Sequence, residues 1–316
     1  MTTDRAAAKP RIVLDCDPGL DDAIAILTAA HHGRLVGITT VNGNVGIEHT
    51  THNALITAQV AGLDVEVHRG AARPLIAPTM DAARIHGATG LGDVALGELR
   101  RSVASDDAVA FLCDTARSVD DLHLVAVGPL TNVALALRRD PDLRSRLAGL
   151  TIMGGGAHAG NVTPVAEFNV WADPEAAAIV FREAAPVTMV GLDVTHKVLL
   201  GGSEASRMRS AGTPASRFAA GLLEYAYDRC REFGLEAAPV HDATAIIAVT
   251  HPHLFRRSSH PVTVELHGEH TRGMTVTDVR PPAAIAAEPA PPAHDVVWDA
   301  DAQAVIDLIV EAVVSA

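Results

Sequence analysis

The sequence predicts an α/β fold: an open, mainly parallel, Rossmann-like sheet with helices on both faces, in a single large domain. Short apolar runs of strand length recur along the 316 residues, and several alternate with Ala- and Leu-rich stretches of helical length. This alternation is typical of right-handed βαβ units, which build parallel sheets. Because 48% of the residues are hydrophobic, the chain is able to bury a large core. We therefore expect one domain over residues 10–316, after a disordered tail, residues 1–9.

Strands and helices are expected in turn along the chain. The expected strands are residues 11–15, 35–41, 65–67, 123–127, 150–153, 187–191 and 262–266. The expected helices are residues 22–31, 50–61, 106–118, 131–139 and 213–233, the last of which ends at Gly234. The C-terminal part is expected to form a hairpin-like stretch (262–278), a Pro/Ala-rich loop (281–294) and a final helix (301–314).

The first strand is followed by an acidic stretch with the sequence DCDPGLDD, residues 15–22. Its Pro-Gly pair marks a tight turn, so the acids lie where a strand ends and a helix begins. This is the usual place for ligands in an open α/β sheet. Asp15 and Asp17 are expected to point to the same side of the strand end. We expect Asp21 to cap the helix and Asp22 to lie in its first turn.

Four carboxylates this close together raise one another's pKa unless a positive charge neutralises them. The sequence has no Lys or Arg between Arg11 and Arg34, so a bound cation is the economical solution. Oxygen ligands favour a hard ion, Ca²⁺ or Mg²⁺, over zinc. A capped turn without a metal is the simpler alternative, but it accounts for one or two of these acids and not for all four.

Other polar segments follow later strands of the expected sheet. Asn44 lies in the turn after the second strand, which points it towards the acids. His86 lies in a loop with three glycines (85–93), and loops of this kind can act as lids. Thr131 opens the helix after the fourth strand, where we expect it to act as the N-cap, and its neighbourhood can offer a carbonyl oxygen to a metal.

Two further segments suit sugar and proton chemistry. Asn161, Glu167 and Asn169 lie between a strand end and a helix start, and amides with a carboxylate suit vicinal sugar hydroxyls. The glycines at 154–156 do not have the G-x-G-x-x-G spacing of a dinucleotide site. His241 beside Asp242 is the arrangement that a proton donor needs, although Asp242 is also a natural helix N-cap.

The whole-chain properties exclude several partners. A formal net charge of -13 argues against nucleic acid and against anionic membranes, but it does not repel a nucleoside or another neutral metabolite. The three cysteines have no paired spacing and are interpreted as reduced thiols of a cytoplasmic protein. We find neither a signal peptide nor an apolar run of membrane-spanning length.

Taken together, these motifs resemble the inosine-uridine-preferring nucleoside hydrolase family over almost the whole chain. The opening D-x-D-P-G-x-D-D is the specific part of the resemblance. It is backed, in the same order, by Asn44, by the segments 128–132 (GPLTN) and 153–156 (MGGG), and by the segments 167–169 (EFN) and 241–243 (HDA).

The resemblance implies a Ca²⁺-dependent hydrolysis of the N-glycosidic bond of ribonucleosides, which gives ribose and a free purine or pyrimidine base. It implies that Asp17 activates a metal-bound water and that His241 protonates the leaving base. For Ca²⁺, the resemblance implies four ligands, supported by Asp15: Asp17, Asp22, Asp242 and the main-chain oxygen of Thr131. For the nucleoside, it implies contacts from Asp21, Asn44, His86, Met153, Asn161, Glu167, Phe168 and Asn169.

One position departs from the family pattern. Arg229 stands where some relatives have a further tyrosine near the base, so the resemblance does not extend to the base preference. It does imply a homo-oligomer, either a homodimer or a homotetramer, in the cytoplasm.

Two other functions remain as alternatives. A haloacid-dehalogenase-like, Mg²⁺-dependent phosphatase also has D-x-D after a strand, but the next positions of that family do not fit residues 18–22. A non-catalytic Ca²⁺-dependent sugar- or nucleoside-binding protein would bind without turnover and would leave His241 idle.

Overall fold

The computed structural model describes residues 9–232, 234–281 and 291–316. The expected N-terminal tail lies outside the described residues apart from Lys9, and so does most of the expected Pro/Ala-rich loop.

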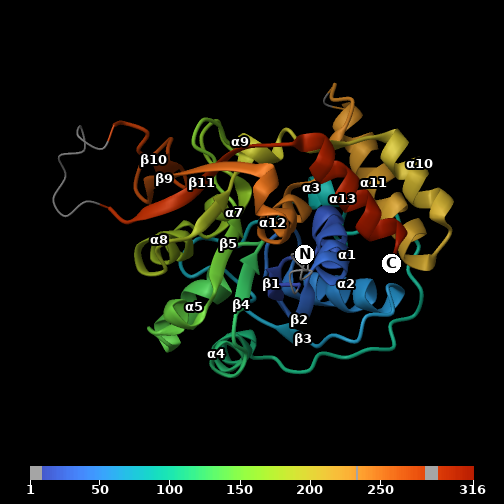
Figure 1. Cartoon of the computed structure of the whole chain (residues 1–316), viewed down its shortest axis with the longest axis horizontal. Helices are drawn as coiled ribbons and strands as arrows, with labels where there is room; N and C mark the ends of the chain where they lie inside the picture. Colours follow the sequence, from blue (N-terminus) through green and yellow to red (C-terminus); the bar gives the residue numbers. More distant parts are fainter. Residues whose placement is uncertain (1–8, 233, 282–290) are drawn as a thin grey trace, which may run out of the picture.

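A nine-stranded sheet forms the centre of the molecule (Figure 1). Its order is β10-β9-β11-β6-β5-β4-β1-β2-β3, and every neighbouring pair from β3 to β11 is parallel. At one edge, β9 pairs antiparallel with β11 on one side and with β10 on the other. The strands are β1 (Arg11–Cys16), β2 (Arg34–Thr40), β3 (Val67–Arg69), β4 (Leu122–Ala126), β5 (Gly149–Met153), β6 (Thr188–Val190), β9 (Phe255–Val264), β10 (Thr275–Thr277) and β11 (Ala293–Ala300).

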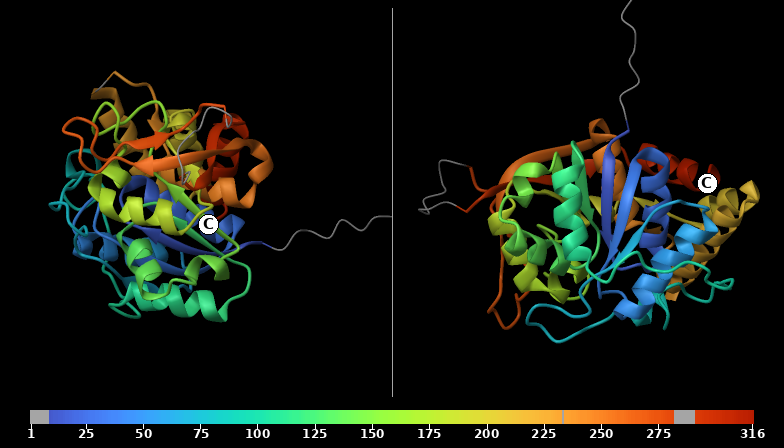
Figure 2. Two further views of the ribbon diagram at one scale, coloured as in Figure 1. Left: turned by 90° about the vertical axis from the view of Figure 1, so that its left-hand side faces the viewer. Right: turned by 90° about the horizontal axis from the view of Figure 1, so that it is seen from below.

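Helices cover both faces of this sheet, as the sequence predicts (Figure 2). One face packs against α1 (Leu20–His32), α2 (Ile47–Val60), α10 (Gly202–Ala211), α11 (Pro214–Glu232), α12 (His241–Thr250) and α13 (Ala302–Val314). The other packs against α4 (Ala108–Ser118), α5 (Thr131–Arg139), α6 (Leu143–Arg146) and α8 (Pro174–Glu183). The short elements are α3 (Ala83–His86), α7 (Phe168–Ala172), α9 (Leu192–Thr195), the 3-10 helix Pro252–Leu254, and the small pair β7 (Leu199–Leu200) and β8 (Ala238–Pro239).

The central strand β1 shows why one chain builds both layers. Its side chains alternate, so Ile12 and Leu14 enter the core under α1 while Val13 enters the core under α4 and α5. Parallel strands covered on both faces are apolar along their length, which made these runs recognisable in the sequence.

Two features of the C-terminal part differ from the expectation. The antiparallel strand β9 begins at Phe255, before the expected residue 262, and β11 occupies residues 293–300, of which the first two were assigned to a loop. The strand β11 lies between β6 and β9 and completes the parallel part of the sheet. Its sequence AHDVVWDA contains three polar residues, so it lacks the continuous apolar pattern of a buried strand.

The helix starts also correct three expected caps. Gly19, not Asp21, is the N-cap of α1, and Asp22 accepts the Gly19 N–H from the third helical position. Thr131 is the first helical residue of α5, and its hydroxyl donates to Asp173 at 2.6 Å and caps nothing. Asp242 likewise lies within the first turn of α12, whose N-cap is Val240. These side chains are thereby free of the capping role that the simpler interpretation gave them.

The strand order 3-2-1-4-5-6 changes direction next to β1, so the carboxyl ends of β1 and β4 open a crevice between them. The loops that follow the parallel strands converge at this crevice. No helix in the described residues is both long and apolar enough to cross a membrane.

Candidate active site

A cavity of about 350 Å³ opens above the carboxyl ends of the parallel strands. It contains side chains from segments that are far apart in the sequence, from Asp21 on α1 to His241 on α12. All the predicted nucleoside-binding residues line it, together with the pair on α12: Asp21, Asn44, His86, Met153, Asn161, Glu167, Phe168, Asn169, His241 and Asp242.

Asp17 and Asp22 are buried beside this cavity without lining it, and hydrogen bonds from the turn around them hold both carboxylates. The Asp22 carboxylate accepts the N–H of Asp17 at 3.1 Å and of Gly19 at 2.9 Å. Asn44 donates its side-chain amide to Asp22 at 3.0 Å and its backbone N–H to Asp17 at 2.6 Å. The second strand's turn therefore fixes both acids, which explains the position of Asn44.

Two glycines make room for Asp17. A Cβ atom at Gly43 would lie 2.0 Å from Asp17 Oδ2, and one at Gly128 would lie 2.5 Å from Asp17 Oδ1. The carboxylate is thus clamped between the turns after β2 and β4, where no larger residue fits.

Asp15 and Thr131 are anchored by a second layer of buried side chains. Asp15 Oδ1 accepts hydrogen bonds from Thr39 at 2.5 Å and from Asn132 at 2.7 Å. Thr131 is held through its hydroxyl by Asp173, whose other oxygen caps α8. Both residues are consequently rigid, and Asp15 lies behind the site and not on the cavity wall.

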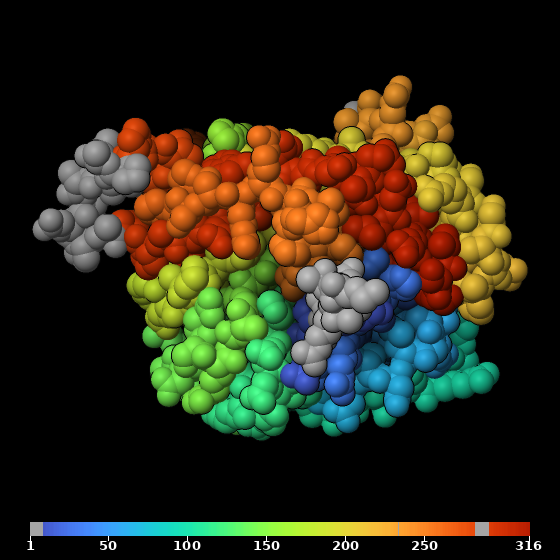
Figure 3. Space-filling view, in the orientation of Figure 1, coloured from blue at the N-terminus to red at the C-terminus, as the bar shows by residue number. Residues whose placement is uncertain are grey.

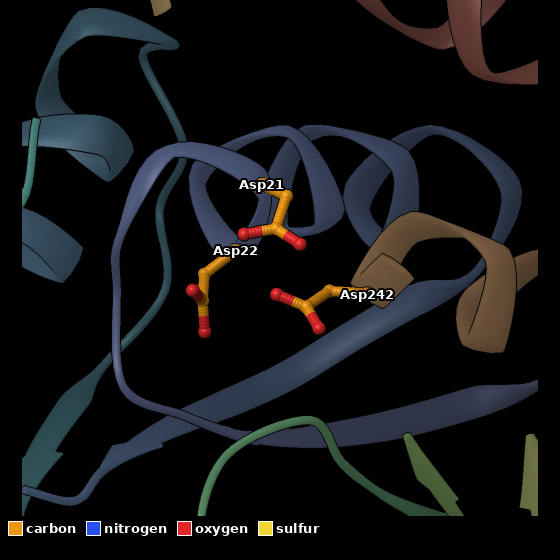
Figure 4. A group of neighbouring side chains, drawn as sticks. All are labelled: Asp21, Asp22 and Asp242. Atoms are coloured by element: carbon orange, nitrogen blue, oxygen red, sulfur yellow. The ribbon is translucent and has the colours of Figure 1, made fainter. Parts of the chain in front are cut away.

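Three carboxylates converge from two helices: Asp21 and Asp22 on α1 and Asp242 on α12 (Figure 4). One oxygen from each lies within 4.8 Å of the others. Burial, and then repulsion from Asp21, raises the pKa of Asp22 to about 7. Burial and neighbouring acids also raise the pKa of Asp17 and of Asp242 well above the usual range.

The donor set fits a hard divalent cation. Asp15 Oδ2 and Asp17 Oδ1 are buried and have no hydrogen-bond partner. Within residues 9–232, 234–281 and 291–316, no Lys or Arg forms an ion pair with Asp15, Asp17, Asp22 or Asp242. Buried, uncompensated carboxylates are costly, and a bound cation with oxygen ligands removes that cost.

On the opposite wall, Glu167 and Asn169 are oriented by the main chain. Glu167 caps α7 and accepts N–H groups from Gly155 at 2.9 Å and from Asn169 at 2.9 Å. The Asn169 amide donates to the carbonyls of Val127 at 2.7 Å and Met153 at 3.1 Å, which joins the ends of β4 and β5. Burial raises the pKa of Glu167 to about 7.

Two histidines line the cavity close to the acids. His241 Nδ1 lies 2.8 Å from the hydroxyl of Thr195, and burial lowers the pKa of His241 to about 4. His86 Nδ1 accepts the backbone N–H of Leu20 at 3.1 Å, which ties the glycine-containing loop to the start of α1. Both imidazoles are therefore uncharged at neutral pH in this arrangement.

The structure adds cavity residues that the sequence interpretation did not name. The helix α11 and the segment after it supply an apolar wall, and His196 follows α9 into the cavity. Arg229, in contrast, does not line the cavity: it pairs with Glu232, and its guanidinium carbon lies 5.5 Å from the centre of the Tyr225 ring. The apolar wall residues are Leu222, Leu223, Ala226, Cys230, Leu235 and Ala238.

Comparisons with known proteins agree on one family. The model of the inosine-uridine preferring nucleoside hydrolases matches residues 12–307. The inosine-uridine preferring nucleoside hydrolase of Leishmania major is 42% identical over 281 residues, which are 86% of this chain and 88% of that protein. The pyrimidine-specific ribonucleoside hydrolase RihA of Salmonella typhimurium is 41% identical over 84% of this chain and 88% of its own.

Solved structures give the same result. The purine-preferring ribonucleoside hydrolase from Gardnerella vaginalis superposes with a TM-score of 0.89 at 31% identity, covering 96% of this chain and 98% of that one. The inosine-guanosine nucleoside hydrolase (IG-NH) has a TM-score of 0.86 at 28% identity and covers 96% and 98%. The matched residues extend from β1 into α13 and include every segment around the cavity, so this chain belongs to the inosine-uridine preferring nucleoside hydrolase family.

Proposed function

We propose that this hydrolase cleaves the N-glycosidic bond of ribonucleosides with one bound Ca²⁺, giving ribose and the free base. The observation that carries the proposal is the buried, uncompensated acid cluster, of which Asp21 and Asp242 line a cavity of about 350 Å³, a size that suits a nucleoside. The family match supports the reaction class, and the residue roles below are our own assignment.

The ion's ligands would be Asp17, Asp22, Asp242 and the main-chain oxygen of Thr131, with Asp15 supporting them from behind. A set made only of oxygens suits Ca²⁺, which takes six to eight such ligands. A bound Ca²⁺ orients water and sugar hydroxyls and lowers the pKa of the water. Thr131 supports this assignment because its anchored hydroxyl holds the first turn of α5 in place.

The chain's own residues bind the ribose and stabilise its charge. Asp21, Asn44, Asn161, Glu167 and Asn169 would hold the ribose hydroxyls, and Met153 would pack under the ring. Breaking the bond builds positive charge on the sugar, as in glycoside hydrolysis. Carboxylates already fixed around the ring favour that charge without reorganising.

Asp17 and His241 would act on opposite sides of the bond. Asp17 takes a proton from the attacking water as the oxygen bonds to the anomeric carbon. His241 presents an imidazole N–H to the base, which gains the electron pair of the broken bond. Phe168 and His86 would lie nearer the base than the sugar. The two flanking groups come from the turn after β1 and from α12, so no covalent intermediate is required.

Relatives with different base preferences do not decide which base this enzyme releases. One is described as pyrimidine-specific and another as purine-preferring. The base end of this cavity is lined by the apolar α11 wall, which contacts any aromatic base without selecting its polar edge.

The test is incubation with inosine, uridine, adenosine and cytidine, followed by assays of free ribose and of the released base. We expect ribose and base in equal amounts from at least one nucleoside. Binding without any release would support the non-catalytic alternative instead. Release of phosphate from sugar phosphates, with no ribose from nucleosides, would support the phosphatase alternative.

The expected assembly and location stay predictions. A homodimer or homotetramer is expected from the family resemblance, and sedimentation of the full chain distinguishes them from a monomer. A cytoplasmic location agrees with three free cysteines in the described residues, two of them buried.

A further inference from the structure

The short helix α9 forms a support for the leaving-group end of the cavity. It follows β6 directly, at the edge of the sheet where the acids lie. Asp193 accepts the N–H of Ala157 at 2.7 Å and contacts His158 at 2.6 Å, which fastens α9 to the loop after β5. The next residue along from α9, His196, lines the cavity.

Thr195, the last residue of α9, is fully buried, and its hydroxyl lies 2.8 Å from His241 Nδ1. Buried Thr244, on the same helix as His241, donates instead to the carbonyl four residues earlier, Val240, at 2.7 Å. Half-buried Thr250 donates to the Ile246 carbonyl at 3.1 Å, and its hydroxyl also lies 2.9 Å from His251 Nδ1. Within the described residues, the Thr195 hydroxyl makes no such bond, and His241 Nδ1 is its only side-chain partner.

Two proton arrangements satisfy this contact unequally. If His241 donated from Nδ1, the hydroxyl hydrogen of Thr195 would be buried without an acceptor, which is unfavourable. If Thr195 donates to Nδ1, its hydrogen is used, and the imidazole proton must then be on Nε2. His241 Nε2 has no hydrogen-bond partner among the described residues, and His241 lines the cavity.

We propose that Thr195 is a positioning residue: it donates to His241 Nδ1 and so holds His241 as the tautomer whose Nε2–H faces the leaving base. This proposal rests on the proposed function, because it assigns the hydrogen-bond acceptor and donor atoms of His241 in that same site. In this proposal His241 stabilises the leaving base by a hydrogen bond from Nε2–H and does not transfer a proton to it.

The reaction balances without an imidazolium. The water oxygen bonds to the anomeric carbon, and its proton goes to Asp17. The electron pair of the broken C–N bond leaves with the base, which departs as an anion hydrogen-bonded by His241 Nε2–H. The proton on Asp17 then passes through solvent to the base, so both side chains return to their starting state.

The direct test is ¹⁵N NMR of the full chain labelled at histidine, with His241 assigned from the spectrum of His241→Gln. We expect His241 Nδ1 to have the shift of an unprotonated nitrogen and Nε2 that of a protonated one. In Thr195→Val, both shifts should move towards a mixture of tautomers. Thr195→Ser, which keeps the hydroxyl, should resemble the wild type.

Thr250→Val is the matched control, because it removes a threonine hydroxyl from the same helix as His241 and should leave these shifts unchanged. A wild-type His241 protonated at Nδ1 overturns the proposal, and so does an unchanged tautomer in Thr195→Val. The wild-type spectrum decides this even where a variant fails to fold.

Kinetics supply the second readout. Thr195→Val should lower kcat for a nucleoside by about tenfold, the effect of one misdirected hydrogen bond in a transition state, with KM within about twofold. Nitrophenyl riboside, whose leaving group needs no donor, should react at the wild-type rate, and Thr195→Ser should restore the nucleoside rate. Equal slowing of both substrates contradicts the proposal. If the wild type releases no ribose at all, the proposed function fails, while the NMR result still stands by itself.

Discussion

Without metal, the wild type should lose stability relative to Asp22→Asn as the pH rises, because the acid cluster lacks a countercharge. The pKa of Asp22 is raised from 3.8 to about 7, so the folded protein without metal keeps a proton that the unfolded chain loses above about pH 4. Protonated Asp22 therefore stabilises the folded protein at low pH, and this stabilisation is lost as the pH rises through about 7. Between pH 5 and pH 7 the loss is about 2 kcal/mol.

Comparison with Asp22→Asn isolates that loss. Buried histidines with a lowered pKa, such as His294 at about 4, stabilise the folded protein increasingly as the pH rises. They are present in both proteins, so their contribution cancels in the comparison. Without calcium, the stability of the wild type relative to Asp22→Asn should therefore fall by about 2.5 kcal/mol from pH 5 to pH 7.5. At roughly 2 to 4 °C per kcal/mol, this is a relative change in Tm of about 5 to 10 °C.

Calcium should act in the opposite direction. At 100 times its Kd, a ligand that binds only the folded state adds about 2.7 kcal/mol, which the wild type should gain at pH 7.5 and Asp22→Asn should not. The assay is thermal unfolding by circular dichroism, with chelator and with calcium. Asp140→Asn is the control, because buried Asp140 is already paired with Arg117 and Arg146. Its variant should lose similar stability at both pH values and keep the calcium response. A relative stability that does not change with pH, and no response to calcium, would refute the reasoning.

Three further changes test the residue roles. Asp17→Ala should lower the rate of ribose release by at least about 10²-fold, since it removes the general base, while the circular dichroism spectrum stays native. Substantial remaining turnover would exclude that role. His241→Ala should slow a nucleoside by about 10²-fold but slow nitrophenyl riboside less, and equal slowing would remove His241 from the leaving-group side. Gly43→Ala puts a Cβ 2.0 Å from Asp17 Oδ2 and should weaken calcium binding by at least about tenfold, measured by calorimetry, whereas Gly46→Ala meets nothing within 4 Å and should bind as the wild type does.

The sequence predicted the parallel core of the fold because those strands are buried on both faces and consist of apolar runs. It predicted β11 poorly because His294 and Asp295 interrupt the apolar pattern, and only the pairing with β6 and β9 makes this segment a strand. The helix starts were misassigned by position: Asp21 and Asp242 follow turns as caps do, but Gly19 and Val240 hold the cap positions.

The site could be predicted where chemistry was concentrated in the sequence. The crowded acids after β1 indicated a cation, and the structure brings two of them, Asp21 and Asp22, close to Asp242, while one oxygen of Asp17 stays buried without a hydrogen-bond partner. The anchoring contacts could not be predicted, because Thr195 and Asp173 meet their partners only through tertiary packing. For Thr195 the available signal was its position soon after β6, at the same edge of the sheet as the acids, whereas Asp173 lies between α7 and α8.

Calcium occupancy and turnover measured on the same samples test the central claim most directly. Chelated protein is titrated with Ca²⁺ while bound metal is counted per chain and ribose release from an active nucleoside is followed. We expect one ion per chain, with turnover rising in proportion to occupancy from a negligible starting rate. Full turnover in protein that contains no bound metal would contradict the account.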